Sequence, residues 1–106
     1  MAFFRVSIGG GSGSLVQTGS YVTNTSTAVD VPLTFSPSKV IVYQNMDSSS
    51  YAFVAVSENQ GAFEGWRMNG STAAKGAGTF TWNGNTFSHK ARAGYGGQTA
   101  YYIATG

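Results

Sequence analysis

The chain of 106 residues contains no cysteine. Disulfides, thiol chemistry and cysteine-ligated zinc sites are therefore excluded. Charge is scarce as well, because only 9% of the residues are Asp, Glu, Lys or Arg, whereas an average protein has about 25%. The net charge is +2, and so few scattered cations form no stripe that could follow the phosphates of a nucleic acid. We therefore expect a surface of Ser, Thr, Asn, Gln and Gly, as in extracellular or particle-borne proteins and in proteins covered within an assembly.

Long apolar runs are also missing. No stretch approaches the roughly 18 apolar residues of a membrane span. The apolar start Phe3–Val6 is interrupted by Arg5 and is too short for a signal peptide. No segment keeps the apolar period of a helix over three turns. The sequence therefore predicts little or no helix, no membrane insertion, and synthesis in a cytoplasm without a secretory signal.

The segment 29–43 shows what the chain has instead. Its first part, Val29–Phe35, places an apolar side chain at every second position, which is the period of a half-buried strand. Pro37 fixes its own φ and disfavours helix at Ser36, so a turn is expected there. The run Val40–Tyr43 is β-branched with an aromatic end, and it suits a strand that is buried on both faces.

Runs of this kind recur along the chain and are separated by turn residues at the spacing of a sandwich or barrel. They predict an all-β fold, with a single antiparallel β-sandwich over residues 1–106. Residues 1–14 form an N-terminal strand and a Gly/Ser-rich turn or arm in this interpretation. The expected strands are 3–8, 15–18, 20–23, 29–34, 39–44, 51–57, 62–68, 78–82, 86–90 and 99–105.

Turn and core residues follow from the same patterns. Asn83-Gly84 is the strongest hairpin signal, because a type I′ turn needs positive φ at both central residues. Ser71–Gly78 is small and rich in Gly and Ala, which predicts a loop. Alternation along the strands predicts a core made of Val6, Ile8, Val16, Val29, Val31, Leu33, Phe35, Val40, Val42, Phe53, Ala55, Phe80, Phe87, Tyr101 and Ile103.

Catalytic and metal-binding patterns are weak. His89 is the only histidine; we expect it to point to solvent or to a neighbouring chain, with a ligand-binding or inter-subunit metal role as the alternative. Glu58 and Glu64 flank a short segment and could form an acid/base pair, but chance explains such a pair better. No G-x-S-x-G occurs. The sequence therefore predicts a protein that is not an enzyme and that has no cofactor, metal or catalytic residue.

Aromatic residues exceed what a core of this size must hold. Aromatic rings beside Asn, Gln and Arg are the usual means of gripping sugars and protein partners, since a flat ring gives large contact area at low entropy cost. The alternative is that these rings lie in the core or at a subunit interface. The candidate ligand-binding residues are Trp66, Arg67, Asn69, Trp82, Tyr95 and Gln98.

Three stretches carry a family resemblance. The stretch Val31-Pro-Leu-Thr-Phe-Ser-Pro-Ser-Lys-Val-Ile-Val42 resembles the pattern v-x-L-x-F-x-P-x-x-V-I-V of small β-domains in phage and prophage tail proteins. It is also similar to a strand pair of H-type lectins. The closing Gly97–Gly106 stretch is similar to the Y-x-Y-x-A-x-G ending of the tail domains, and Gly78–Trp82 looks like their G-F-x-V strand. The resemblance extends from Gly19 to the end of the chain.

The resemblance implies an H-type lectin-like or jelly-roll sandwich at the distal end of a phage tail, fibre or baseplate. Such domains are usually homotrimers that bind a host-surface glycan or support the module that does. We therefore expect a virion structural or adhesion protein, associated with the tail tip or fibre and in contact with other virion proteins. A free-standing soluble lectin and a capsid decoration protein are the alternatives. No family catalytic residue is available to transfer to this chain.

Overall fold

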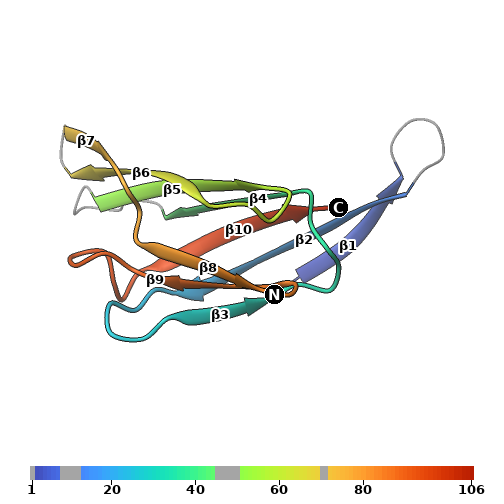
Figure 1. Ribbon diagram of the computed structural model, residues 1–106, viewed down its shortest axis with the longest axis horizontal. Coiled ribbons are helices and arrows are strands. Elements are labelled where there is room, and N and C mark those ends of the chain that lie inside the picture. The colour runs from blue at the N-terminus through green and yellow to red at the C-terminus, as the bar shows by residue number, and fades with distance from the viewer. Residues whose placement is uncertain (1, 8–12, 45–50, 70–71) are drawn as a thin grey trace.

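The protein, represented by a computed structural model, is described over residues 2–7, 13–44, 51–69 and 72–106. These residues form strands, turns and loops without a helix, and the strands make two antiparallel sheets that lie as two layers (Figure 1). The predicted all-β class and the β-sandwich are thereby confirmed. The molecule measures 44 × 26 × 22 Å, and the β1–β2 hairpin extends along its long axis beyond the second layer (Figure 1).

The larger sheet has seven strands and the smaller has three. In spatial order the larger sheet consists of β1 (Ala2–Ser7), β2 (Gly13–Val22), β10 (Thr99–Thr105), β4 (Lys39–Gln44), β5 (Tyr51–Glu58), β6 (Glu64–Asn69) and β7 (Thr72–Lys75). The smaller sheet consists of β3 (Val29–Pro32), β9 (Thr86–Lys90) and β8 (Thr79–Asn83).

Two predicted elements differ from the structure. The predicted strands 15–18 and 20–23 are one strand, β2, because its pairing with β10 continues unbroken from Val16 to Val22 through Gly19. The prediction of a loop over Ser71–Gly78 is wrong for β7, which pairs with β6 over four residues. Local propensity favours a loop there, but the backbone of β6 offers a free edge that β7 completes.

The core lies between the two sheets. Tyr102 and Phe87 meet at its centre, with ring centroids 5.9 Å apart and edge to face. The buried residues Ala55, Ala100 and Ala104 on the larger sheet leave the space that these rings fill. Of the predicted core, Val31, Leu33, Val40, Val42, Phe53, Ala55 and Phe87 are buried, and Val16, Val29, Phe35 and Phe80 are half-buried. The side chain of Val6 and the whole of Ile8 lie outside the described residues.

The predicted burial of Tyr101 and Ile103 is wrong. They are 40% and 39% exposed, whereas the intervening Tyr102 is buried. Both faces of β10 carry apolar residues, so the two-residue period is compatible with either choice. Side-chain volume decides which face of β10 is buried. The face with Tyr102 between Ala100 and Ala104 fits the space between the sheets.

The prediction that His89 points to solvent or to another chain is also wrong. Its side chain is fully buried and stacks on Phe80 at 4.0 Å between ring centroids. Nε2 lies 3.0 Å from the carbonyl oxygen of Ala77, which can only accept, so Nε2 carries the proton. Nδ1 then accepts from the hydroxyl of Tyr21 at 2.8 Å. Burial lowers the pKa of His89, against a smaller opposing effect of the Ala77 hydrogen bond.

The turns at one end of the sandwich are joined by hydrogen bonds. The hairpin turn predicted at Asn83-Gly84 lies one residue later, since Asn83 pairs with Thr86 and only Gly84 has positive φ, at 59°. This is the pattern of a type II′ turn. The type I′ pattern occurs instead at Asn59-Gln60, with φ of 51° and 56°. The Gln60 amide donates to the carbonyl oxygen of Gly84 at 2.6 Å and thereby links the two turns.

Candidate functional site

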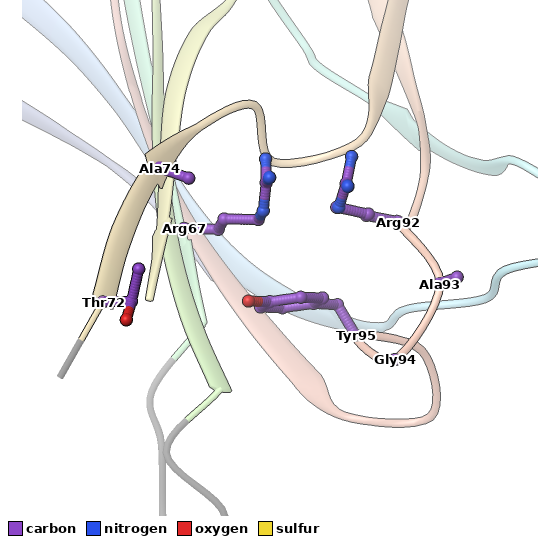
Figure 2. A pocket seen from close by; sticks show the side chains of 7 residues that line it. All are labelled: Arg67, Thr72, Ala74, Arg92, Ala93, Gly94 and Tyr95. Carbon is purple, nitrogen blue, oxygen red and sulfur yellow. The ribbon is translucent and has the colours of Figure 1, made fainter. Parts of the chain in front are cut away.

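A cleft of about 590 Å³ opens at the other end of the molecule, where β6 and β7 meet the loop between β9 and β10. We call it the arginine cleft; it is lined by Arg67, Thr72, Ala74, Arg92, Ala93, Gly94 and Tyr95. Figure 2 shows the guanidinium groups of Arg67 and Arg92 extending in the same direction, with the ring of Tyr95 below them. Two cations from distant parts of the sequence therefore meet at one surface depression.

The backbone after β7 holds Arg67 in place. Arg67 belongs to the face of β6 that carries the core, and its cross-strand neighbours are Phe53 and Ala74. Its Nη1 group donates to the carbonyl oxygens of Lys75 and Gly76, the latter at 3.0 Å. Both bonds leave from Nη1. Within the described part of the chain, the Nε and Nη2 donors keep no protein acceptor and stay available to a ligand.

Arg92 stands on a short turn that two further contacts fix. The amide of Tyr95 donates to the carbonyl oxygen of Arg92 at 2.9 Å, and Gly94 has a φ of 91°, as the third position of a type II turn requires. The hydroxyl of Tyr95 donates to the carbonyl oxygen of Met68 at 2.7 Å, which ties the turn to β6. The side chain of Arg92 is exposed and makes no hydrogen bond or ion pair with any described residue.

Thr23 anchors the remainder of this loop. Its amide donates to the carbonyl oxygen of Gln98 at 2.8 Å, and its carbonyl oxygen accepts from the amide of Gly97 at 2.7 Å. Its hydroxyl lies 2.8 Å from the carbonyl oxygen of Tyr95. The loop that carries Arg92 is thus braced at both ends, and the cleft is preorganised by backbone contacts.

The cleft is electropositive. None of its lining residues is a carboxylate. Glu64 lies 3.9 Å from Lys75 on the exposed edge of the sheet, and Asp30 accepts from Ser88 at 2.5 Å on the smaller sheet. Two guanidinium groups with no carboxylate beside them among the described residues repel each other, and an anion placed between them would remove that repulsion.

The other candidate ligand residues lie elsewhere. Trp66 projects from the opposite face of β6 and is 54% exposed. Trp82 packs on Phe63 and donates from Nε1 to the carbonyl oxygen of Gly61 at 3.2 Å. It therefore lies near the two turns that the Gln60–Gly84 hydrogen bond links. Gln98 precedes β10 and does not line the cleft. The side chain of Asn69 lies outside the described residues. The structure therefore brings together Arg67 and Tyr95 out of the predicted set.

Sequence reasoning missed Arg92. Arg92-Ala-Gly-Tyr95 carries a local turn signal, with Gly at the position that requires positive φ. That signal predicts the turn, but the meeting of Arg92 with Arg67 depends on how β6 and the loop after β9 pack together. Tyr95 also differs from expectation in detail, since its ring is only 4% exposed and forms the floor of the cleft, with no open face for stacking a sugar.

The uncovered side of the larger sheet is a second candidate surface. We call it the outer face. Antiparallel register places Tyr101, Tyr43, Val54 and Trp66 side by side across β10, β4, β5 and β6. The rings of Tyr43 and Tyr101 stack at 5.5 Å between centroids. The neighbouring rows add Ile103, Ile41, Val56, Val22, Ala52 and Met68.

A hollow of about 500 Å³ lies at one side of the outer face, over β2 and β10. Ser20, which has a small side chain, borders it on β2, and the Tyr43–Tyr101 pair borders it on the other side. Trp66 projects at the opposite side of the same row, three strands away. The outer face therefore has both a projection and a depression.

Searches among protein-family models, curated proteins and solved structures find no match to this chain. Within the described ranges, no three His, Asp or Glu side chains gather as a metal site would require. The described part of the chain also has no helix long and apolar enough to cross a membrane.

Proposed function

We propose that the protein is a non-enzymatic structural or adhesion subunit of a phage-type virion, assembled from several copies of this chain through the outer face. The observation that carries the proposal is the row Tyr101–Tyr43–Val54–Trp66, which is aromatic or aliphatic throughout and faces solvent in the single chain. Single exposed apolar residues are ordinary on protein surfaces, but a contiguous patch marks a contact surface.

The size of the outer face agrees with such a contact. Strands lie about 4.8 Å apart and alternate residues about 7 Å apart, so the rows from β2 to β6 cover on the order of 400 Å² in projection. A standard interface buries about 800 Å² on each partner, with an apolar centre and a polar rim. The apolar rows supply that centre. The polar rim lies at the two sides of the sheet and consists of Thr18, Ser20, Glu64 and Lys75.

A second copy is the occupant that the outer face itself favours. A two-fold axis parallel to the strands between β4 and β5 would place Trp66 of each copy over Tyr101 of the other, beside the hollow. It would also place Val54 over Tyr43 and leave Lys75 opposite Ser20, so that no like charges meet. A self-complementary face of this kind closes upon itself and requires no other protein.

The assignment to a virion rests on two further supports. The stretches Val31–Val42 and Gly97–Gly106 resemble tail-protein β-domains, and the first of them forms the end of β3, the connecting turn and β4. The chain is also poor in charge, which suits a subunit with large dry contacts. Contact with other virion proteins and location in the virion remain predictions. The homotrimer expected from the resemblance also remains a prediction, and it would need a contact other than the two-fold pairing described above.

Size-exclusion chromatography with light scattering tests the proposal. We expect the parent protein to elute as two or more chains at micromolar concentration, and the Trp66→Ser, Tyr101→Ser double variant to elute as one chain with an unchanged far-ultraviolet dichroism spectrum. Thr81→Ala, on the exposed side of β8, is the matched control and should leave the assembly intact. A parent protein that is strictly monomeric, or a double variant that assembles like the parent, would contradict it.

A further inference from the structure

We infer that the arginine cleft is a binding site for an acidic saccharide, with Arg67 and Arg92 holding the sugar's carboxylate. The inference goes beyond the assembly proposed above. Arg67 belongs to the inner side of β6 and Trp66 to the outer side, so the cleft and the outer face are separate surfaces that separate variants can test.

The positive charge of the two arginines favours an anionic ligand in the cleft. Arg67 is fixed by the carbonyl oxygens of Lys75 and Gly76. The guanidinium group of Arg92 lies beside it without a hydrogen-bond or ion-pair partner among the described residues (Figure 2). Planar guanidinium groups match a carboxylate with two parallel hydrogen bonds, which gives direction as well as charge neutralisation. A ligand carboxylate between the two groups would therefore neutralise like charges that no described residue balances.

The size of the cleft and the groups that line it favour a saccharide as the ligand. A volume of about 590 Å³ is far larger than a simple inorganic anion needs and is within the range of small-ligand sites. The hydroxyl of Thr72 and the backbone of the Ala93–Gly94 turn can meet sugar hydroxyls. Ala74 and Ala93 are too small to fill the space, and their methyl groups are apolar parts of its lining. Polar groups around a space of this size suit a pyranose ring that carries an acid.

The structure also supplies the rigidity that weak sugar binding needs. The Arg92–Tyr95 turn is bonded to Met68 through Tyr95, and the chain after it is bonded to Thr23. Arg67 is held by the segment after β7. A site in which the Arg67 guanidinium group and the backbone that carries Arg92 are already positioned loses less conformational entropy on binding.

Isothermal titration calorimetry with a panel of oligosaccharides tests the inference. The acidic members contain glucuronic, galacturonic or N-acetylneuraminic acid, and each is paired with its carboxyl methyl ester, which has the same ring without the charge. We expect at least one acid to bind with a dissociation constant below about 1 mM. We expect its ester to bind at least about ten-fold more weakly, and binding to weaken as salt is raised.

Variants locate the binding within the molecule. Arg92→Gln should weaken binding of the acid at least about ten-fold. Because the Arg92 side chain is exposed and makes no hydrogen bond or ion pair with any described residue, the fold should be unaffected. Lys39→Gln removes the same charge at the start of β4 and is the matched control; it should bind like the parent. Arg67→Gln should act like Arg92→Gln, with dichroism to establish that β7 remains paired.

Each contrary outcome overturns the inference. Failure of every acid to bind at 1 mM would do so, as would equal binding of acid and ester, or an Arg92→Gln variant that binds like the parent. Binding of inorganic phosphate or sulfate but of none of the carboxylated sugars would assign the cleft to a tetrahedral oxyanion instead. The result does not depend on the assembly state, since the Trp66→Ser, Tyr101→Ser variant should bind the acid as the parent does.

Discussion

At the scale of single residues, the interior depends on polar side chains that meet specific partners. Gln17 is fully buried, and both polar atoms of its side-chain amide are hydrogen-bonded. Nε2 donates to the carbonyl oxygen of Pro32 and to the hydroxyl of Tyr102. Oε1 accepts from the amide and the hydroxyl of Thr34. Gln17 thus ties β2 and β10 to the end of β3. Within the described residues one buried side-chain donor, Nε2 of Gln44, lacks a partner.

His89 makes folding stability sensitive to mild acid. Burial holds its pKa below the ordinary value of about 6.5, so the unfolded chain takes up a proton first as the pH falls. The stability that depends on neutral His89 is therefore full above about pH 6.5 and is lost as the pH falls below 6.5 toward the depressed pKa, by about 1.4 kcal/mol per pH unit at most. Urea unfolding between pH 5 and 7.5 measures this slope above the range in which carboxylates titrate.

A His89→Phe variant separates titration from packing. Phenylalanine can stack on Phe80, but it leaves the hydroxyl of Tyr21 and the carbonyl oxygen of Ala77 without a partner, which should cost about 1–3 kcal/mol at neutral pH. The unfolding free energy of this variant should be nearly independent of pH between 5 and 7.5. A variant that keeps the slope of the parent would show that another group is responsible.

At the scale of elements, the connection between the two sheets requires glycine. The chain leaves the larger sheet after β7 and enters β8 through Gly78, whose φ is 114°. A Cβ at this position would lie 2.5 Å from the carbonyl oxygen of Lys90 and 2.8 Å from Nε2 of His89. The connection from β7 to β8 therefore needs a residue without a Cβ at position 78, because the backbone there lies against β9.

Gly78→Ala should destabilise the protein by more than about 2 kcal/mol, because it adds a steric clash to an unfavourable dihedral angle. Gly84→Ala is the matched control. Gly84 also has positive φ, but nothing lies within 4 Å of a Cβ built there, so its substitution should cost only the dihedral term of about 1–2 kcal/mol. Chemical denaturation of both variants gives the comparison. Equal losses would contradict the steric explanation.

Element boundaries were more predictable from the sequence than element environments. The strands 39–44, 86–90 and 99–105 agree with β4, β9 and β10 to the residue, because β-branched and aromatic runs between turn residues have few alternatives. The buried side of β10 could not be predicted, since Tyr101 and Tyr102 are equally apolar. The environment of His89 was missed because its partners Tyr21 and Ala77 come from other parts of the fold.

The candidate site was predictable only in part for the same reason. Arg67 and Tyr95 were identified by residue type, as polar or aromatic groups near strand ends. Their partner Arg92 is recognised only when β6 and the β9–β10 loop are placed together. Trp66 and Trp82 were grouped with them by type, although they belong to the outer face and to the interior cluster beside Phe63. Composition finds candidates, but tertiary packing decides which of them share a surface.

At the scale of the whole molecule, assembly through the outer face would couple folding to concentration. A contact made only by folded chains stabilises the folded state by mass action. The melting temperature of the parent protein should therefore rise by a few degrees for each ten-fold increase in concentration. The Trp66→Ser, Tyr101→Ser variant should melt at one temperature throughout. Differential scanning calorimetry over a hundred-fold range measures both, and a parent protein without concentration dependence would contradict the coupling.

The positions of the two tryptophans give the protein two optical reporters. The chain has two tryptophans in all; Trp82 is half-buried against Phe63 and Phe87 with its indole N–H bonded to a carbonyl oxygen, and Trp66 faces solvent. Their fluorescence therefore responds to different events, Trp82 to the separation of the two sheets and Trp66 to whatever covers the outer face. With one indole replaced by phenylalanine, the emission maximum of the other would report its own event: Trp82 would follow unfolding in the Trp66→Phe variant, and Trp66 would follow association in the Trp82→Phe variant.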